Sequence, residues 1–161
     1  MTPQARILIV DDEEVVRLSF MRILADTRYK VKAAASWTQV TQAMQEEPAD
    51  VVLLDLRMPE MDGITVLKAL KQQWPDSEVI VITGYPTLET AKQAVTLGAY
   101  DYLTKPVNPE QVIHASNAAW LHKRWALHND RAATAGGGRR GDASGGQGGL
   151  PDQPDFSRTS S

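Results

Sequence analysis

The sequence predicts an α/β domain built on a five-stranded parallel sheet that is doubly wound with five helices. Three short runs, residues 7–10, 51–54 and 79–82, are entirely apolar, which is typical of strands buried on both faces. Between these runs, apolar residues recur at helical spacing. Strands that alternate with helices indicate a parallel sheet covered by helices on both sides.

Each element has its own signal along the chain. The expected strands cover residues 7–10, 31–35, 51–54, 79–82 and 100–103. Five helices are expected. The first covers residues 14–25, and the others begin at Ser36, Asp62, Leu88 and Asn108-Pro109. Ser36 with Gln39 fits a capping box, and Asp62 is expected to cap the third helix. The weaker strands, residues 31–35 and 100–103, are expected at the flanks of the sheet.

Composition excludes several classes of protein. The chain has 161 residues, a net charge of −3 and no cysteine, so direct nucleic-acid binding, disulfides and a cysteine nucleophile are not expected. No stretch approaches the roughly 18 apolar residues of a membrane span, and the N-terminus has no apolar signal-peptide core. A soluble, cytoplasmic protein without membrane contact is therefore expected.

The C-terminal segment differs from the rest. Eight of the eleven glycines lie between Gly136 and Gly149, with few large apolar residues around them. Such a segment buries too little surface to offset its chain entropy. We therefore expect one folded domain at residues 1–130 and a disordered, Gly/Ser-rich tail at residues 131–161.

Polar side chains follow the expected strands at the edge where an α/β sheet places its active crevice. They are Asp11, Asp12, Asp55, Thr83 and Lys105. Clustered carboxylates repel one another unless a cation compensates, and oxygen ligands favour Mg²⁺ or Mn²⁺. A carboxylate, a divalent ion, an ammonium and a hydroxyl around one point suit phosphoryl transfer, with Asp55 as the nucleophile.

Each of these residues also has an ordinary interpretation. An Asp after a strand is usually a turn residue or a helix cap, and Asp11 with Asp12 could simply begin an acidic helix N-terminus. Lys105 could be an exposed loop residue, and Thr83 a strand end. Their occurrence in compatible order at successive strand ends favours a joint site.

Four segments carry a resemblance to a known family. Asp11-Asp12, "LLDLRMPEMDG", "VIVITGY" and "GAYDYLTKPV" resemble the bacterial response-regulator receiver domain over residues 5–128. The resemblance implies a flavodoxin-like sheet with strand order 2-1-3-4-5, counted along the chain. It also implies that Asp55 is the phosphoacceptor, that Asp12 binds Mg²⁺ directly and Asp11 through water, and that the Arg57 main-chain carbonyl is a further ligand.

The resemblance extends to switching and to the partner that donates phosphate. Thr83 and Lys105 would contact the phosphoryl oxygens, and Tyr102 matches an aromatic residue that rotates inward when Thr83 moves. Arg57 and Tyr85 occupy positions that tune the lifetime of the phosphate. The donor would be a phosphohistidine on a sensor histidine kinase or a phosphotransfer protein.

The final helix has two apolar faces. One, with Val112, Ala115, Ala119 and Ala126, is expected to pack on the sheet. The other carries His114, Ala118, Leu121 and Trp125. An outer apolar stripe suggests a partner surface, with a symmetric dimer through the fourth helix, fifth strand and final helix as the leading form. Alternatively, these side chains pack against the neighbouring helix or the tail.

The output of the domain stays open. The segments "YPTLETAKQAVTLGAYDYLTKPVNPEQV" and "HKRWALHNDRA" most resemble receivers of the nitrogen-regulation type, which usually precede an ATPase and a DNA-binding domain. The chain could be a stand-alone phosphorelay shuttle, which the Gly-rich tail fits better, or the N-terminal piece of a longer transcriptional activator. Gly63 could serve either tight backbone geometry or simple helix packing.

Other classes fit less well. A haloacid-dehalogenase-type phosphatase needs a second Asp where this chain has Arg57. The complete residue set argues against a degenerate receiver that only binds partners, and no glycine-rich loop follows the first strand as in nucleotide-binding proteins. His114, His122 and His128 lack the i, i+4 spacing of a helical metal site.

Overall fold

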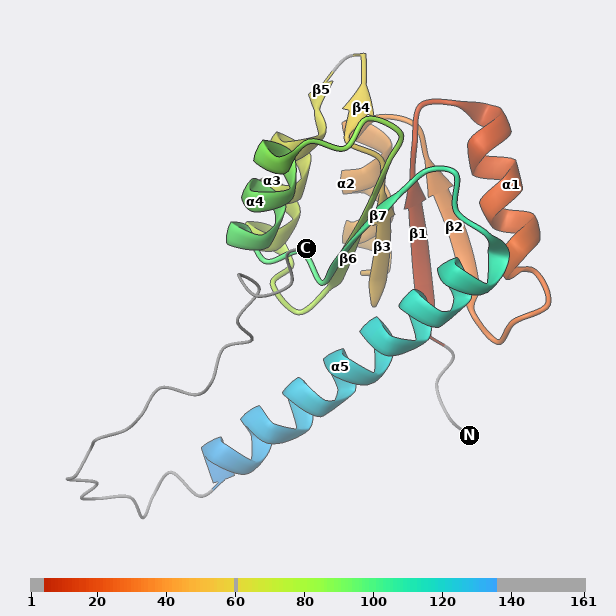
Figure 1. The fold of residues 1–161 in the computed structure, drawn as a ribbon. Coiled ribbons are helices and arrows are strands. Elements are labelled where there is room, and N and C mark those ends of the chain that lie inside the picture. The colour runs from red at the N-terminus through yellow and green to blue at the C-terminus, as the bar shows by residue number, and fades with distance from the viewer. Residues whose placement is uncertain (1–4, 60, 136–161) are drawn as a thin grey trace. The chain divides into compact units, whose positions relative to one another are not determined.

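A five-stranded parallel sheet forms the centre of the fold (Figure 1). From edge to edge it contains β2 (Lys30–Ala34), β1 (Arg6–Val10), β3 (Val51–Leu54), β6 (Glu78–Thr83) and β7 (Asp101–Thr104). All neighbouring pairs are parallel. Because β4 and β5 lie outside this sheet, the order along the chain is 2-1-3-4-5, and the predicted fold class is confirmed.

The computed structural model describes residues 5–59 and 61–135. The chain divides into two units, residues 1–125 and residues 126–161, and the sheet belongs to the first. Of the predicted tail, residues 131–135 are helical and the others lie outside the described residues, so the predicted boundary at residue 130 stays a prediction. Within the described part of the chain, no helix combines the length and apolarity that crossing a membrane requires.

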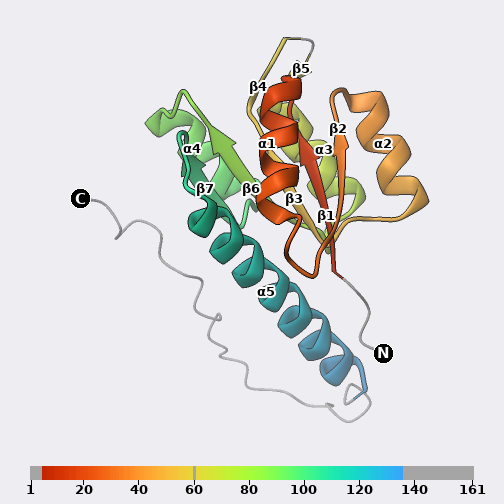
Figure 2. The same cartoon turned by 90° about the vertical axis from the view of Figure 1, so that its right-hand side faces the viewer.

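Helices cover both faces of the sheet (Figures 1 and 2). The core on one face includes side chains of α2 (Trp37–Glu46), α3 (Gly63–Gln73) and α4 (Leu88–Thr96). The core on the other face includes side chains of α1 (Glu14–Leu24) and α5 (Pro109–Ala135). All four residues of β3 are at most 2 % exposed, as expected for a central strand with helices on both sides. Each such side chain contributes about 1.5–3 kcal/mol through burial.

Most predicted helix ends are confirmed by their hydrogen bonds. The Ser36 hydroxyl accepts from the Gln39 amide at 3.3 Å, but the Gln39 side chain accepts from the Ala35 amide, so the predicted capping box is only half formed. The Asn108 side chain accepts from the Gln111 amide at 2.8 Å. Asp62 was predicted to cap α3, and this is wrong: it stands at the N-cap position without a side-chain bond to the helix backbone. The Gly63 amide instead donates to the Leu56 carbonyl at 3.0 Å.

A two-stranded hairpin, absent from the sequence prediction, follows β3. It pairs β4 (Arg57–Met58) with β5 (Met61–Asp62) in antiparallel register, so that Arg57 lies opposite Asp62. At two residues each, these strands are too short for their alternation to be recognised in the sequence. The hairpin gives the segment after Asp55 a definite path.

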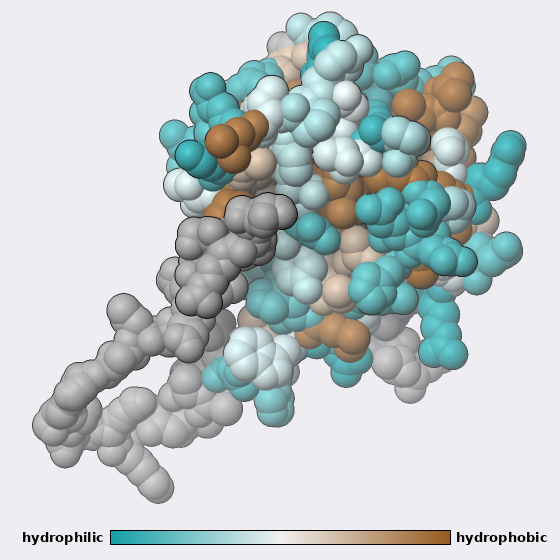
Figure 3. Space-filling view, in the orientation of Figure 1, coloured by the Kyte–Doolittle hydropathy of each residue, from teal (hydrophilic) through white to brown (hydrophobic). Residues whose placement is uncertain are grey.

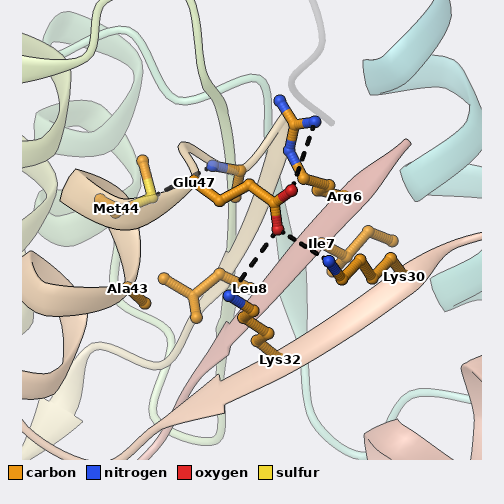
Figure 4. Close-up of a pocket in the computed structure, with 9 residues that line it drawn as sticks. Arg6, Ile7, Leu8, Lys30, Lys32, Ala43, Met44 and Glu47 are labelled. Atoms are coloured by element: carbon orange, nitrogen blue, oxygen red, sulfur yellow. Dashed lines mark hydrogen bonds and ion pairs between the residues drawn. The ribbon is translucent and has the colours of Figure 1, made fainter. Parts of the chain in front are cut away.

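The edge strand β2 is accompanied by a small cluster of charges (Figure 4). Glu47 lies 3.0 Å from Lys30, 3.7 Å from Lys32 and 4.0 Å from Arg6. The Lys30 hydrogen bond and the surrounding cations hold the pKa of Glu47 below its usual value, against the opposing effect of burial. The cavity beside them, about 10 Å³, holds one water molecule at most, so this is a structural cluster and not a ligand site.

Two buried acids at the amino edge of the sheet hold α5. The Lys123 ammonium lies 2.6 Å from the Asp50 carboxylate, and the His122 ring bonds to Glu78. Asp50 and Glu78 sit at the start of neighbouring strands, so α5 is attached there by two consecutive residues. The predicted inner face of α5 is confirmed for Val112, Ala115 and Ala119, which are buried.

Candidate functional site

Loops at the carboxyl edge of the sheet bring the predicted acidic residues together. Asp11 and Asp12 follow β1 directly, and Asp55 follows β3. Each of the three residues has one carboxylate oxygen that lies within 4.8 Å of a carboxylate oxygen of the other two. The predicted carboxylate cluster is therefore present in the fold.

Lys105, which follows β7, supplies the positive charge of this cluster. Its ammonium nitrogen lies 3.3 Å from Asp11 Oδ2 and 3.4 Å from Asp55 Oδ2. Asp11 is 1 % exposed and Asp55 6 % exposed, so both carboxylates have lost most of their hydration. One ammonium therefore faces two dehydrated carboxylates, with the half-buried Asp12 beside them.

The charges in the cluster shift one another's pKa values. Burial raises the pKa of the Asp55 carboxyl, and the Asp11 charge raises it further. The hydrogen bond from the Arg57 amide and the charge of Lys105 lower this pKa, but by less. Burial alone would lower the pKa of the Lys105 ammonium, but the charges of Asp11 and Asp55 outweigh it and raise that pKa. Burial is the main cause of the raised pKa and the Asp11 charge is a lesser one, so a further cation near Asp55 would favour its ionised form.

Backbone amides orient the two buried carboxylates. Asp11 Oδ1 accepts from the Glu13 amide at 2.9 Å, and Asp55 Oδ1 accepts from the Arg57 amide at 3.1 Å. In both residues the other oxygen, Oδ2, faces Lys105. Arg17 was not predicted to contribute, yet its guanidinium donates to the Asp11 carbonyl at 2.9 Å and ties α1 to the end of β1.

The cluster opens into a pocket of about 580 Å³. Asp12, Asp55 and Lys105 line it, together with the start of the hairpin and with Gly84 and Tyr85 from the loop after β6. Asp11 and Thr83 are buried beside the pocket and do not line it. Asp55 therefore stands at the boundary between a charged interior and an accessible space.

Thr83 ends β6, where it was predicted, but its hydroxyl is engaged locally. The Tyr85 amide donates to Thr83 Oγ1 at 3.1 Å, and the Lys105 amide donates to the Thr83 carbonyl at 2.8 Å. The first contact holds the start of the loop that leads to α4. The second places the loop that carries Lys105 beside the end of β6.

The two residues expected to tune phosphate lifetime meet over the pocket. The Arg57 guanidinium carbon lies 3.8 Å from the centre of the Tyr85 ring, which is cation–π geometry. Arg57 comes from the hairpin and Tyr85 from the loop after β6, and both line the pocket. This contact joins two loops that are distant in the sequence.

Tyr102 points toward α4. Its hydroxyl lies 2.7 Å from Thr90 Oγ1, and its ring packs against the core on the α3 and α4 face. Thr87 and Thr90 form a capping box at the start of α4, in which the side chain of each accepts from the other's backbone amide. Thr90 was missed in the sequence, because the usual capping-box signature has Glu or Gln at this position.

The outer stripe of α5 is largely exposed. Leu121 is 61 % exposed and Trp125 63 % exposed, His114 is exposed, and Ala118 is half-buried. On α4, Leu88 and Val95 are also exposed. On the side of the molecule seen in Figure 3, small hydrophobic patches lie over α4 and α5, with hydrophilic residues between them.

Gly63 resolves one open question. A Cβ atom at this position would lie 2.3 Å from Leu56 Cα and 2.5 Å from the Leu56 carbonyl oxygen. Gly63 has no positive φ, so glycine is required here by the close packing of the helix start against the Leu56 backbone. The contact fixes the start of α3 against the residue that follows Asp55.

A doubly wound parallel sheet with an acidic cluster and a lysine at its carboxyl edge is the arrangement that the sequence resemblance implied. The family described as "Response regulator receiver domain" matches residues 7–117, and the chain belongs to this family of two-component signal transduction proteins. The predicted resemblance is confirmed.

Comparison with individual proteins agrees. The chain is 42 % identical over 109 residues to an NtrX-like response regulator of Rickettsia bellii, covering 66 % of this chain and 23 % of that protein. It is 39 % identical over 109 residues to the alginate biosynthesis transcriptional regulatory protein AlgB of Pseudomonas syringae, covering 68 % and 24 %. The chain thus spans about a quarter of the length of these relatives.

A solved structure has the same fold. The CheY-like receiver domain protein of Methanospirillum hungatei matches with a TM-score of 0.74 and 29 % identity. The match covers 77 % of this chain and 99 % of that one. The similarity therefore extends over a whole receiver domain.

The contact at Gly63 leads to a stability prediction. Gly63→Ala places a methyl group against the Leu56 backbone, which cannot move as a flexible side chain would. We expect the free energy of unfolding to fall by about 3 kcal/mol or more, measured by urea denaturation followed by circular dichroism. Gly84→Ala is the matched control, because its nearest neighbour is the Lys105 side chain at 3.8 Å. Equal stability of the two variants would contradict this account.

Proposed function

We propose that Asp55 accepts a phosphoryl group from the phosphohistidine of a sensor histidine kinase or a phosphotransfer protein. The observation that carries the proposal is the position of Asp55, which lies 3.4 Å from Lys105 and opens into the pocket. Membership of the receiver family supports it. The domain is then a signalling switch, and it catalyses only its own phosphorylation and dephosphorylation.

The transfer exchanges one bond for another. A carboxylate oxygen of Asp55 attacks phosphorus in line with the donor's P–N bond, and a P–O bond forms as the P–N bond breaks. The imidazole leaves with the electron pair and takes up a proton. Lys105 stabilises the negative charge on the phosphoryl oxygens, and Thr83 donates its hydroxyl hydrogen to one of them.

The acidic cluster suits a divalent cation. Its donors are hard carboxylate oxygens with no His or Cys, which favours Mg²⁺, with Mn²⁺ as a substitute. Asp12 and Asp55 would bind the ion directly, Asp11 through water, and the Arg57 main-chain carbonyl would complete the protein ligands. When bound, the ion supplies charge that neutralises the acids and the incoming phosphoryl oxygens.

The first test is phosphate incorporation from a small acyl phosphate with Mg²⁺ present. Asp55→Asn should abolish it, because a neutral amide is a poor nucleophile at phosphorus. Intact-protein mass spectrometry measures the added phosphate directly. Removal of divalent ions with a chelator should have the same effect on the unmodified protein, and Mn²⁺ should restore labelling.

The control is Asp26→Asn, which changes an exposed carboxylate remote from the cluster in the loop between α1 and β2. This variant should incorporate phosphate as the unmodified protein does. Undiminished labelling of the Asp55→Asn variant would place the acceptor elsewhere and refute the proposal.

The stacked Arg57 and Tyr85 should protect the phosphate from water. Replacing both with Ala opens the pocket on the side where they meet and should shorten the half-life of the phosphorylated protein about threefold or more, a modest change in barrier. Decay of the labelled protein after removal of the donor gives the half-life. Tyr85→Phe keeps the ring and serves as control. An unchanged or longer half-life in the double variant contradicts the role of the pair.

We also propose that phosphorylation changes a dimer surface on α4, β7 and α5. Its apolar residues are Leu121 and Trp125 on α5, with Leu88 and Val95 on α4, and large apolar side chains are typical of protein interfaces. The phosphate acts on this surface through the loop after β6, as Thr83 turns toward it and Tyr102 changes orientation.

Molar mass in solution tests the dimer. Adding beryllofluoride with Mg²⁺ to mimic the phosphoryl group should convert monomer to dimer, as measured by light scattering. The Leu121→Ser, Trp125→Ser double variant should stay monomeric. Val15→Ser is the control, since Val15 is 77 % exposed but lies on α1, away from the proposed surface. A protein that stays monomeric with the mimic would exclude this surface as a switched dimer interface.

A further inference from the structure

The Thr90 side chain takes part in both the capping box of α4 and a contact with Tyr102 of β7. Its hydroxyl oxygen lies 2.7 Å from the Tyr102 hydroxyl, and it also accepts from the Thr87 amide at 3.3 Å within the capping box of α4. It lies 2.9 Å from the Thr87 hydroxyl and 3.2 Å from the Thr87 carbonyl as well. One side chain on α4 therefore contacts both the helix cap and the aromatic residue of β7.

A threonine hydroxyl cannot satisfy all four contacts at once. It has one hydrogen to donate and two lone pairs to accept with, which makes three hydrogen bonds at most. The Thr87 amide can only donate and the Thr87 carbonyl can only accept, so the two hydroxyls of Thr87 and Tyr102 compete for what remains. The contact with Tyr102 is the shortest of the four. The bond to Tyr102 therefore competes with the Thr87 hydroxyl, while both bonds of the capping box are kept.

The position of Tyr102 connects this contact to the site. In the register of β6 and β7, Val81 lies opposite Tyr102 and Thr83 lies opposite Thr104. Side chains alternate along a strand, so Thr83 and Tyr102 lie on the same face, one pleat apart. The residues that join Thr83 to α4, from Gly84 to Thr87, are all exposed. Few contacts besides those of Thr83, Arg57 and Thr90 hold this connection.

We propose that Thr90 is a positioning residue that holds Tyr102 in its resting orientation and links its rotation to the start of α4. The inference rests on the proposed function, in which phosphorylation of Asp55 shifts Thr83 and Tyr102. When Tyr102 leaves, the Thr90 hydroxyl is free to bond the Thr87 hydroxyl, which lies 2.9 Å away at the start of α4. The first turn of α4, with the exposed Leu88, then changes its contacts in step with the site.

The affinity for beryllofluoride with Mg²⁺ tests the Thr90–Tyr102 hydrogen bond, called here the latch. A contact made only in the resting state opposes binding, so its removal should tighten the apparent affinity, followed by fluorine NMR. Thr90→Val keeps the branched shape and loses the hydroxyl, and we expect about fivefold tighter binding, the value of one hydrogen bond. Thr90→Ser restores the hydroxyl and should bind within about twofold of the unmodified protein.

A double-mutant cycle shows whether the two residues act through each other. Tyr102→Phe removes the same bond from the other side and should also tighten binding. The Thr90→Val, Tyr102→Phe double variant should bind no more tightly than the stronger single variant. Additive effects, or unchanged affinity in both single variants, would overturn the latch. Because the bond is approached from both sides, instability of one variant does not prevent the test.

A second readout separates positioning from general loosening. In the amide NMR spectrum of free Thr90→Val protein, the α4 signals should move toward their positions in the unmodified protein with beryllofluoride bound. Thr87→Ala weakens the cap without touching Tyr102 and should not produce this movement. If the unmodified protein does not bind beryllofluoride, the proposed phosphoryl site itself fails. If it binds and the variants do not couple, only the latch fails.

Discussion

The pairing of one lysine with two buried aspartates is the interaction on which the carboxyl edge of this sheet depends. Two like charges at such separations repel by about 3–4 kcal/mol at the effective dielectric of a protein surface. Lys105 offsets part of this repulsion, since its ammonium lies within 3.4 Å of both Asp11 and Asp55. The pKa of Asp55 nevertheless stays raised, chiefly because of burial and further because of the Asp11 charge. A cation at the cluster would lower this cost of ionising Asp55.

The sheet explains why these charges meet, and this part follows from the sequence. Asp11 follows Val10, and Asp55 follows Leu54, which lies opposite Val10 in the register of β1 and β3. Lys105 follows Thr104, which lies opposite Thr83. Parallel strands end at one edge, so the first polar residue after each apolar run is placed there without knowledge of any loop. The acidic cluster was therefore predictable from the residues, while the strand order followed from the family resemblance.

The loops were less predictable, because their contacts follow no period. The Asp62 carboxylate was expected to cap α3, but the close approach of Gly63 to Leu56 turns the first amide of the helix toward a backbone carbonyl. Arg57 and Tyr85 stack across two loops, and no spacing rule places them together. Tyr102 is recognisable in the sequence as a strand residue, whereas Thr90 was missed, and only the fold brings their hydroxyls to 2.7 Å.

The sheet and α3 are held by apolar packing, whereas the loop before α4 is held by a few polar contacts. This difference in rigidity suits a switch. The strands and α3 are fixed by buried apolar surface, with Val66, Leu67 and Leu70 fully buried, and local chemistry at the edge does not displace them. The segment between Thr83 and α4 depends instead on one amide–hydroxyl bond, one cation–π contact and one shared hydroxyl, each worth about 1 kcal/mol. A phosphoryl group on Asp55, as proposed, would make charge-assisted bonds of comparable or greater strength. The balance of energies therefore allows a change confined to Asp55 to move the start of α4 while the sheet stays in place.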